Sequence, residues 1–325
     1  MPTSLRRRAF VGLAALSAAS RRAAAQGVTR DVRLIVPYAP GGTVDTLARL
    51  LAEVLPATIG HNVVVENRSG AGAFIGLQTV ANAPADGHTL SLAPDLGLSV
   101  SPVIPGATLP IDPDRALVPI ASLIRVPTLL VARNNAPFAT FQELISYARA
   151  NPGRVTAGVS GTGTITHLLI ARLSALTGVT MEHVPYRGGT PALLDVIAGN
   201  VDLYFSLITE SMPHVEGGKM RPIVFASSDR NRELPDVPTL AETWPGFTGT
   251  ADYGLVAAAG LSPDWVAFWN RTVNVALARP EVRERLLRLR AEPAGGSSAD
   301  YAAKLREERE VWGRVVREAG IRAGS

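Results

Sequence analysis

One stretch of the chain decides its fold class: residues 32–55, which have the sequence VRLIVPYAPGGTVDTLARLLAEVL. Residues 32–36 form a short apolar run, which predicts a buried strand. Residues 37–42 contain two prolines and two glycines, which predict a turn. From Thr43 onward, apolar residues recur at the three- and four-residue spacing of an amphipathic helix. A strand, a glycine turn and a helix in this order are typical of an α/β fold with a mostly parallel sheet.

The same unit recurs along the rest of the chain, which has 325 residues. Short apolar runs alternate with amphipathic stretches, so the α/β prediction extends to the whole chain. The further predicted strands cover residues 62–66, 88–93, 128–132, 155–159, 181–184, 201–205, 221–225 and 253–257. The further predicted helices cover residues 141–150, led by Thr140 as a cap, and then 165–176, 191–198, 263–278, 280–291 and 299–319.

The order of these elements predicts two lobes. The strand-and-helix pattern restarts after Pro127, and the strand at 253–257 returns the chain towards the first unit. The length is sufficient for two domains with cores of their own. We expect each lobe to be a mostly parallel sheet flanked by helices, with crossing points near Pro127 and Thr250. The first lobe is predicted to contain residues 26–127 plus 251–325, and the second residues 128–250.

Residues 1–25 predict an export signal peptide. Three arginines at 6–8 precede a short apolar run at 10–19, and the alanines at 23–25 suit a signal peptidase. The apolar run is too short to span a bilayer as a permanent helix. The first arginine group also resembles a twin-arginine signal, so the export route stays open. We expect cleavage near Gln26 and a periplasmic location.

The basic charge of the chain belongs largely to this signal. The isoelectric point near 9.7 is a value found in nucleic-acid-binding proteins. Five of the 32 Lys and Arg residues precede Gln26, where no acidic residue stands, and the other 27 face 28 acidic residues. The mature chain is therefore nearly neutral, and we expect no nucleic-acid partner. The absence of cysteine excludes disulfides and thiolate metal sites, and the five histidines lack metal-ligand spacing, so no metal or cofactor is expected.

Four glycine turns carry the functional signal. They lie at residues 40–43, 69–72, 160–164 and 186–190, each after a predicted strand and before a helix. In an open parallel sheet such turns gather at the carboxyl ends of the strands, where ligands bind. The backbone N–H groups at a helix N-terminus favour an anion, and glycine lets the backbone approach it. One such turn is ordinary loop chemistry, but two in each lobe predict a carboxylate-binding cleft.

An exported enzyme on a similar scaffold is an alternative. Residues 158–162 lack the last glycine of a hydrolase nucleophile elbow, because Thr162 stands in its place. No glycine turn carries the lysine of a phosphate loop. His167 lies close to Ser160 and Thr164 along the chain, and a structural role is favoured over a catalytic one. We therefore expect no catalytic residues, and an α/β hydrolase remains the less favoured possibility.

Short motifs between residues 32 and 321 share their order and spacing with one family. They are VPYAPGG at 36–42 with Asp45 and Arg49, VENR at 65–68, GAG at 70–72, DGHTL at 86–90, GTG at 161–163, VPYRG at 184–188 and PDVPT at 235–239. With these motifs the chain resembles the extracytoplasmic solute receptors of tripartite tricarboxylate transporters, also called Bug-type receptors.

The resemblance implies a two-lobed periplasmic binding protein fold, similar to type II, with the ligand cleft between the lobes. It also implies a small organic carboxylate as ligand and delivery to the membrane permease subunits of a tripartite tricarboxylate transporter. A sensor that presents the same ligand to a signalling partner is an alternative that the sequence leaves open. We expect the receptor to be a monomer.

The resemblance further implies the binding loops. Asp45, by contrast, is expected on physical grounds to order the start of its helix together with Arg49 one turn later. Four positions depart from the family pattern: serine is usual where Val159 stands, an acid is common where Ser206 stands, and Asp95 and Asp252 replace uncharged residues. The last two predict negative charge near the cleft and weak binding of polyanions such as citrate. The predicted ligand-binding residues are Tyr38, Pro40, Gly41, Gly42, Thr43, Gly72, Ala73, Phe74, Asp95, Ser160, Gly161, Thr162, Gly163, Thr164, His167, Pro185, Tyr186, Arg187, Gly188 and Ser206.

Overall fold

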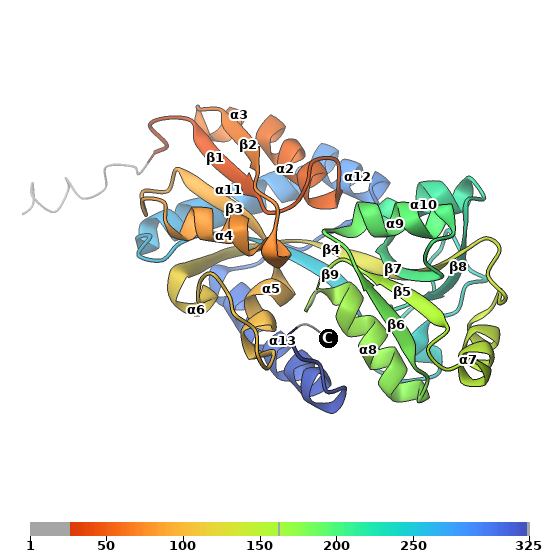
Figure 1. The fold of residues 1–325 in the computed structure, drawn as a ribbon. Coiled ribbons are helices and arrows are strands. Elements are labelled where there is room, and N and C mark those ends of the chain that lie inside the picture. Colours follow the sequence, from red (N-terminus) through yellow and green to blue (C-terminus); the bar gives the residue numbers. More distant parts are fainter. Residues whose placement is uncertain (1–26, 162, 324–325) are drawn as a thin grey trace, which may run out of the picture.

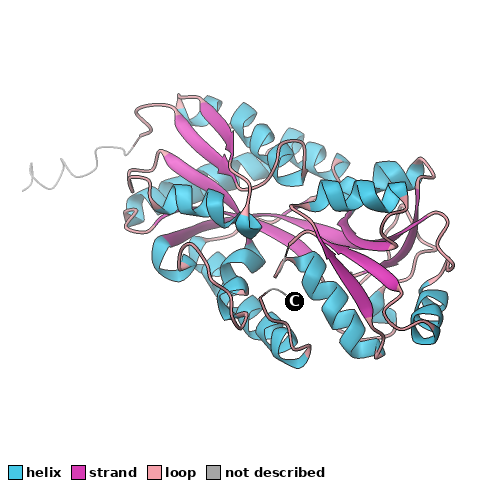
Figure 2. Cartoon of the chain, viewed as in Figure 1, coloured by secondary structure: helices cyan, strands magenta, loops and turns pink. Residues whose placement is uncertain are grey.

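The computed structural model describes residues 27–161 and 163–323, which form an α/β protein (Figures 1 and 2). The predicted fold class is thereby confirmed. The signal peptide predicted at 1–25 and its cleavage near Gln26 lie outside the described residues, as does Thr162.

The first sheet contains the strand with which the sequence prediction began. Its strands, in order across the sheet, are β2 (Val63–Asn67), β1 (Val32–Val36), β3 (Thr89–Pro94), β9 (Thr250–Ala258) and β4 (Leu117–Arg133), with β10 (Glu292–Pro293) paired to β4. β1 has the predicted bounds and runs parallel to both of its neighbours. β9 pairs antiparallel with β3 and with β4. Parallel pairing is therefore confined to the outer part of this sheet.

The second sheet repeats this arrangement. Its strands, in order from β4, are β7 (Leu203–Leu207), β5 (Val155–Val159) and β6 (Met181–Pro185), and β8 (Met220–Phe225) also pairs with β4. β5 runs parallel to β6 and β7, whereas β7 and β8 run antiparallel to β4. Both sheets thus have parallel outer strands and antiparallel strands towards the centre, where the sequence predicted mostly parallel sheets.

β4 is shared by the two sheets, because it changes partners part of the way along its length. Residues 117–127 pair with β9, residues 128–132 pair with β7, and residues 129–133 also pair with β8. At the change, Thr128 Oγ1 donates a hydrogen bond to the carbonyl of Gly249 at 2.7 Å. Figure 1 shows β4 and β9 running through the middle of the molecule between the two groups of strands. The predicted lobe borders fall at this point and stay a prediction.

Helices flank both sheets (Figure 2). Thr140 begins its helix with a capping box to Glu143, which confirms its predicted role. Among the described helices, none has both the length and the apolar composition needed to cross a bilayer. The helices of eight or more residues are α2 (Thr43–Val54), α4 (Phe74–Ala81), α7 (Phe141–Ala150), α8 (Ile165–Thr177), α9 (Gly189–Ala198), α10 (Ile208–Glu216), α11 (Pro263–Ala278), α12 (Pro280–Arg288) and α13 (Ser298–Glu318). The shorter ones are α3 (Pro56–Ile59), α5 (Asp95–Ser99), α6 (Pro113–Ala116) and the 3-10 turns 71–73, 101–103 and 240–242.

Candidate functional site

A cavity of about 430 Å³ lies between the two sheets, beyond the carboxyl ends of β1, β3, β5 and β6. All four predicted glycine turns contribute to its wall, although they are far apart in the sequence. Of the predicted site residues, those that line the cavity are Tyr38, Gly42, Thr43, Gly72, Phe74, Ser160, Gly163, Thr164, Arg187 and Gly188. The fold therefore brings the turns of both sheets to one cavity.

The turn at 40–43 is held in shape by Asp45. The Asp45 carboxylate accepts hydrogen bonds from the Gly41 N–H at 3.0 Å, from Arg49 Nε at 2.9 Å and from Asn67 Nδ2 at 2.9 Å. Burial opposes ionisation of Asp45, but these three donors keep the pKa of its carboxyl below the ordinary value. The predicted role of Asp45 and Arg49 in ordering the helix start is confirmed.

The turn at 160–164 is held by side chains of α8. The Gly163 N–H donates to His167 Nδ1 at 3.1 Å, and the Ser160 N–H donates to Thr166 Oγ1 at 2.9 Å. His167 is buried, and burial together with His183 lowers the pKa of its imidazole to about 4. A neutral imidazole that accepts a backbone hydrogen bond shapes the turn, which is the structural role favoured by the sequence.

Three helices begin at the cavity without a cap from their own side chains. The N-cap residues of α2, α8 and α9 are Gly42, Thr164 and Gly188, and none of them makes a side-chain capping bond. The Thr164 hydroxyl is turned away from its helix and donates instead to the carbonyl of Gly161 at 2.7 Å. The first turn of an uncapped helix has N–H groups that can donate hydrogen bonds to a bound anion.

The other predicted site residues that the structure describes do not line the cavity. Pro40, Gly41, Ala73, Gly161 and Pro185 belong to the predicted loops but are not among the lining residues, and Gly41 lines a second cavity instead. The remaining four make internal contacts. These are Tyr186, whose hydroxyl donates to Asp195 at 2.6 Å; Ser206, whose hydroxyl donates to the Leu207 carbonyl at 2.9 Å; His167, described above; and Asp95.

Asp95 and Asp252 do not bring the expected excess of negative charge to the cleft. Lys304 Nζ lies 2.8 Å from Asp95 Oδ2 and contacts Asp252 Oδ2 as well. Arg125 adds a second cation beside Asp252, at 3.3 Å. The expectation is therefore wrong, because α13 carries a counter-ion that lies more than 50 residues from Asp252 in the sequence and about 200 from Asp95.

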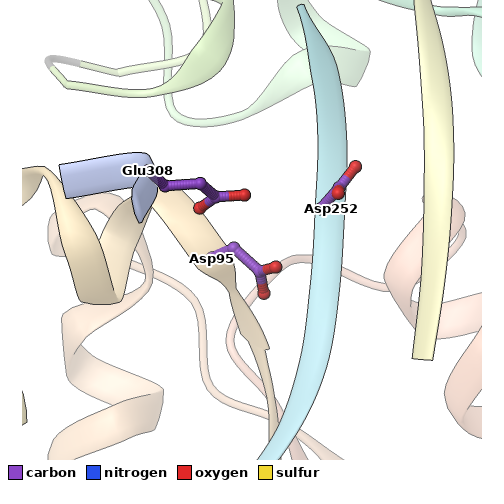
Figure 3. A group of neighbouring side chains, drawn as sticks. All are labelled: Asp95, Asp252 and Glu308. Carbon is purple, nitrogen blue, oxygen red and sulfur yellow. The ribbon is translucent and has the colours of Figure 1, made fainter. Parts of the chain in front are cut away.

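Figure 3 shows that Glu308 of α13 joins these two carboxylates. Oxygens of Asp95, Asp252 and Glu308 lie within 4.8 Å of one another, as they do around a metal ion. Lys304 already supplies the positive charge, since its Nζ contacts both aspartates and lies 3.7 Å from Glu308. Burial raises the pKa of Asp95 and of Glu308, which keeps the cluster close to neutral. We interpret it as an ion-paired anchor for α13.

The sequence prediction missed Glu210, in the first turn of α10. This side chain lines the cavity, and burial raises the pKa of its carboxyl to about 7. Tyr204 and Tyr253 line the same wall and were also missed. The search followed glycine turns, and α10 begins directly after β7 without a glycine. The acid that is common in the family at position 206 was a signal that a carboxyl belongs near this point.

Comparisons with known proteins agree with the site and the fold. The family described as "Tripartite tricarboxylate transporter family receptor" matches residues 47–321. Protein BugT of Bordetella pertussis is 33% identical over 299 residues, which cover 90% of each chain. The structure of R. palustris Rpa4515 with adipate has a TM-score of 0.85 and 34% identity, over 90% of this chain and 98% of its own. The periplasmic binding protein BugD has a TM-score of 0.84 and 31% identity, over 91% of this chain and 99% of its own.

These matches confirm the resemblance that the motifs indicated. The family match begins after β1 and the first glycine turn, and its residues 47–321 include the other three turns. The chain belongs to the tripartite tricarboxylate transporter receptors of the Bug type, a family of periplasmic solute-binding proteins.

Proposed function

We propose that the protein captures a small organic carboxylate in the cavity between its sheets and delivers it to the permease subunits of a tripartite tricarboxylate transporter. One observation carries this proposal: glycine turns from both sheets line one cavity, and three helices begin there without side-chain caps. Rpa4515, which shares the fold, has been solved with the dicarboxylate adipate. A carboxylate is the anion that such helix starts suit.

The proposed binding site draws on both lobes. The first lobe, residues 26–127 and 251–325, supplies Tyr38, Gly42 and Gly72, and the second, residues 128–250, supplies Ser160 and Arg187. Because neither half surrounds a ligand alone, binding is proposed to close the lobes around it. The ligand is then held mainly by backbone N–H groups and hydroxyls.

The role requires no catalytic step. A hydrolase on this scaffold would need a base for Ser160, and the neighbouring His167 is instead buried and accepts the Gly163 N–H. The Ser160 hydroxyl contacts Thr164 and Thr166, at 3.2 and 3.0 Å. These contacts support binding rather than nucleophilic catalysis.

Export is part of the proposal. Residues 1–25 are proposed to direct the chain to the periplasm, by the twin-arginine or the general route, with cleavage near Gln26. Mass spectrometry of periplasmic extracts is expected to give a chain that begins near Gln26. A full-length chain that keeps Met1 in the cytosol would contradict this part of the proposal.

Thermal unfolding with a panel of carboxylates tests the function. A ligand that binds only the folded protein at 100 times its Kd adds about 2.7 kcal/mol of stability. At least one small carboxylate is expected to raise Tm, and calorimetry should then give a single site. Deletion of the gene is expected to abolish uptake of that compound. A panel without any binding, or unchanged uptake, would overturn the proposal.

A further inference from the structure

Glu210 joins the two sides of the cavity. Its Oε1 accepts a hydrogen bond from Thr43 Oγ1 at 3.4 Å, and the Thr43 backbone N–H also bonds to the carboxyl. Thr43 is the first residue of α2, next to the first sheet, whereas Glu210 follows β7 of the second sheet. The carboxyl therefore lies at an uncapped helix start of the opposite side, where an anion is stabilised.

Two glycine turns make room for this carboxyl. A Cβ atom at position 189 would lie 2.6 Å from Glu210 Oε2 and 2.8 Å from the Tyr204 hydroxyl, so a larger residue there would displace one of these groups. A Cβ atom at Gly42 would lie 3.8 Å from Glu210 Oε1. The turns at 40–43 and 186–190 thus flank a carboxyl group that the protein itself supplies.

No described residue supplies a positive charge to this carboxyl. Glu210 Oε2 is buried and has no hydrogen-bond partner in the described part of the chain. Arg187, the cationic side chain in the cavity wall, forms no ion pair with it among the described residues. Beyond the cavity wall, His214 lies one turn further along α10 and borders a second cavity of about 250 Å³. The buried oxygen therefore lacks the donor that a buried carboxylate requires.

We propose that Glu210 determines the specificity of this receptor, and that the ligand carries one carboxylate and, at its other end, an ammonium group. This inference rests on the proposed function and names its ligand class. The Glu210 carboxyl occupies the position at the start of α2. The second carboxylate of a bound diacid would need the same position. A diacid would bring two carboxylates together, whereas an ammonium group gives Oε2 its missing donor.

The proposal fixes the sign of a pH effect. Burial raises the pKa of Glu210 to about 7 in the ligand-free protein. A ligand ammonium favours the ionised carboxylate, so affinity for an amino acid should rise from about pH 6 to about pH 8. Affinity for a diacid should fall over the same range, because its carboxylate favours the protonated form.

The other groups near Glu210 are accounted for. Burial raises the pKa of Tyr38, Tyr204 and Tyr253, so these phenols stay neutral over that range. Asp252 on β9 is ion-paired with Lys304 and Arg125. His214 is the histidine of α10 and lies one turn beyond Glu210. Its contribution is separated by the Glu210→Gln variant, which should remove the pH dependence only if Glu210 causes it.

Calorimetry with two matched sets of ligands tests the proposal. The first set is adipate, hexanoate and 6-aminohexanoate, which share six carbons and differ at one end; the second is succinate, butanoate and 4-aminobutanoate. In at least one set we expect the amino acid to bind about tenfold more tightly than the monocarboxylate, and the diacid to bind most weakly. Glu210→Gln should remove the preference for the amino acid. Glu281→Gln, an exposed glutamate on α12, is the matched control and should change nothing.

Each outcome decides between the two proposals. If the diacid binds most tightly and Glu210→Gln leaves its affinity unchanged, the inference is wrong and the carboxylate receptor stands. If monocarboxylate and amino acid bind equally, the ammonium part of the inference is wrong. If none of the six compounds nor any other carboxylate binds, the proposed function fails together with the inference. Circular dichroism of both variants confirms that they are folded.

Discussion

Three helices that begin at the cavity differ from three that begin elsewhere. α7, α11 and α13 start away from the cavity, and in each the N-cap hydroxyl accepts a hydrogen bond from a backbone N–H group of the first turn. Their N-cap residues are Thr140, Ser262 and Ser297. α2, α8 and α9 start at the cavity wall and lack such a bond. Their N-cap residues are Gly42, Thr164 and Gly188.

The three helices at the cavity lack the stabilisation of a side-chain cap, and their N–H groups can serve binding instead. A side-chain cap stabilises a helix by about 1 kcal/mol, and a helix start without one keeps N–H groups free for a ligand. Thr164 makes the point clearest, because threonine is a good capping residue. Its hydroxyl bonds to the Gly161 carbonyl instead, which leaves the start of α8 open. α12 begins away from the cavity and also lacks a side-chain cap, so a missing cap points to the binding site only together with a glycine turn.

The largest expected effect comes from filling the space at the start of α2, beside the Glu210 carboxyl. Gly42 has φ of −83° and ψ of 177°, which a β-branched residue can adopt, so Gly42→Val should keep the fold. The valine methyl groups would fill the space between α2 and Glu210, and we expect calorimetry to show at least a 100-fold loss of affinity. Gly42→Ala is the matched control, since its Cβ would make an ordinary contact, 3.8 Å from Glu210 Oε1. If the two variants bind the ligand equally well, the start of α2 is not part of the binding site.

A smaller loss is expected from Thr164→Ala. The variant removes a hydroxyl that lines the cavity and holds the turn through the Gly161 carbonyl. We expect a loss of about 1–3 kcal/mol in binding, the range for leaving a buried polar group without its partner, here the partly buried Gly161 carbonyl, and little change in Tm. Arg187 is the rival anchor for the carboxylate. If Arg187→Ala abolishes binding while Thr164→Ala and Gly42→Val do not, the site is an arginine clamp.

The smallest expected effect belongs to the capped helices. Thr140→Ala removes the hydroxyl that accepts the Glu143 N–H at 3.2 Å in α7. We expect it to lower the free energy of unfolding by about 1 kcal/mol, measured by urea denaturation, with ligand affinity unchanged. A change in affinity that equals the one from Thr164→Ala would show that capping and binding are not separated in this fold.

Most of the fold could be predicted, because its strands are short apolar runs between glycines. β1, β5, α7 and α11 have the predicted bounds. The first part of β4, residues 117–127, was missed, since Pro119 and Pro127 interrupt the strand pattern. Proline cannot donate to a neighbouring strand, and the register to β9 shifts between Pro119 and Ala121.

The site could be predicted only where a local signal marks it. The glycine turns were found because strand, turn and helix follow one another in the sequence. Asp95 was misjudged, since its counter-ion Lys304 comes from a helix 209 residues later in the chain. Glu210 was missed because its burial and its contact with Thr43 exist only once the two sheets have come together.

The position of β9 imposes an order on biosynthesis. β9 lies between β3 and β4 in the first sheet, yet it follows them in the chain by more than 110 residues. A nascent chain that ends before Thr250 therefore exposes the facing edges of β3 and β4, and such edges pair readily with other strands. The second sheet, complete by Phe225, can form earlier on the ribosome. An exported chain of this topology needs a chaperone, or an unfolded state, until its last quarter has been synthesised.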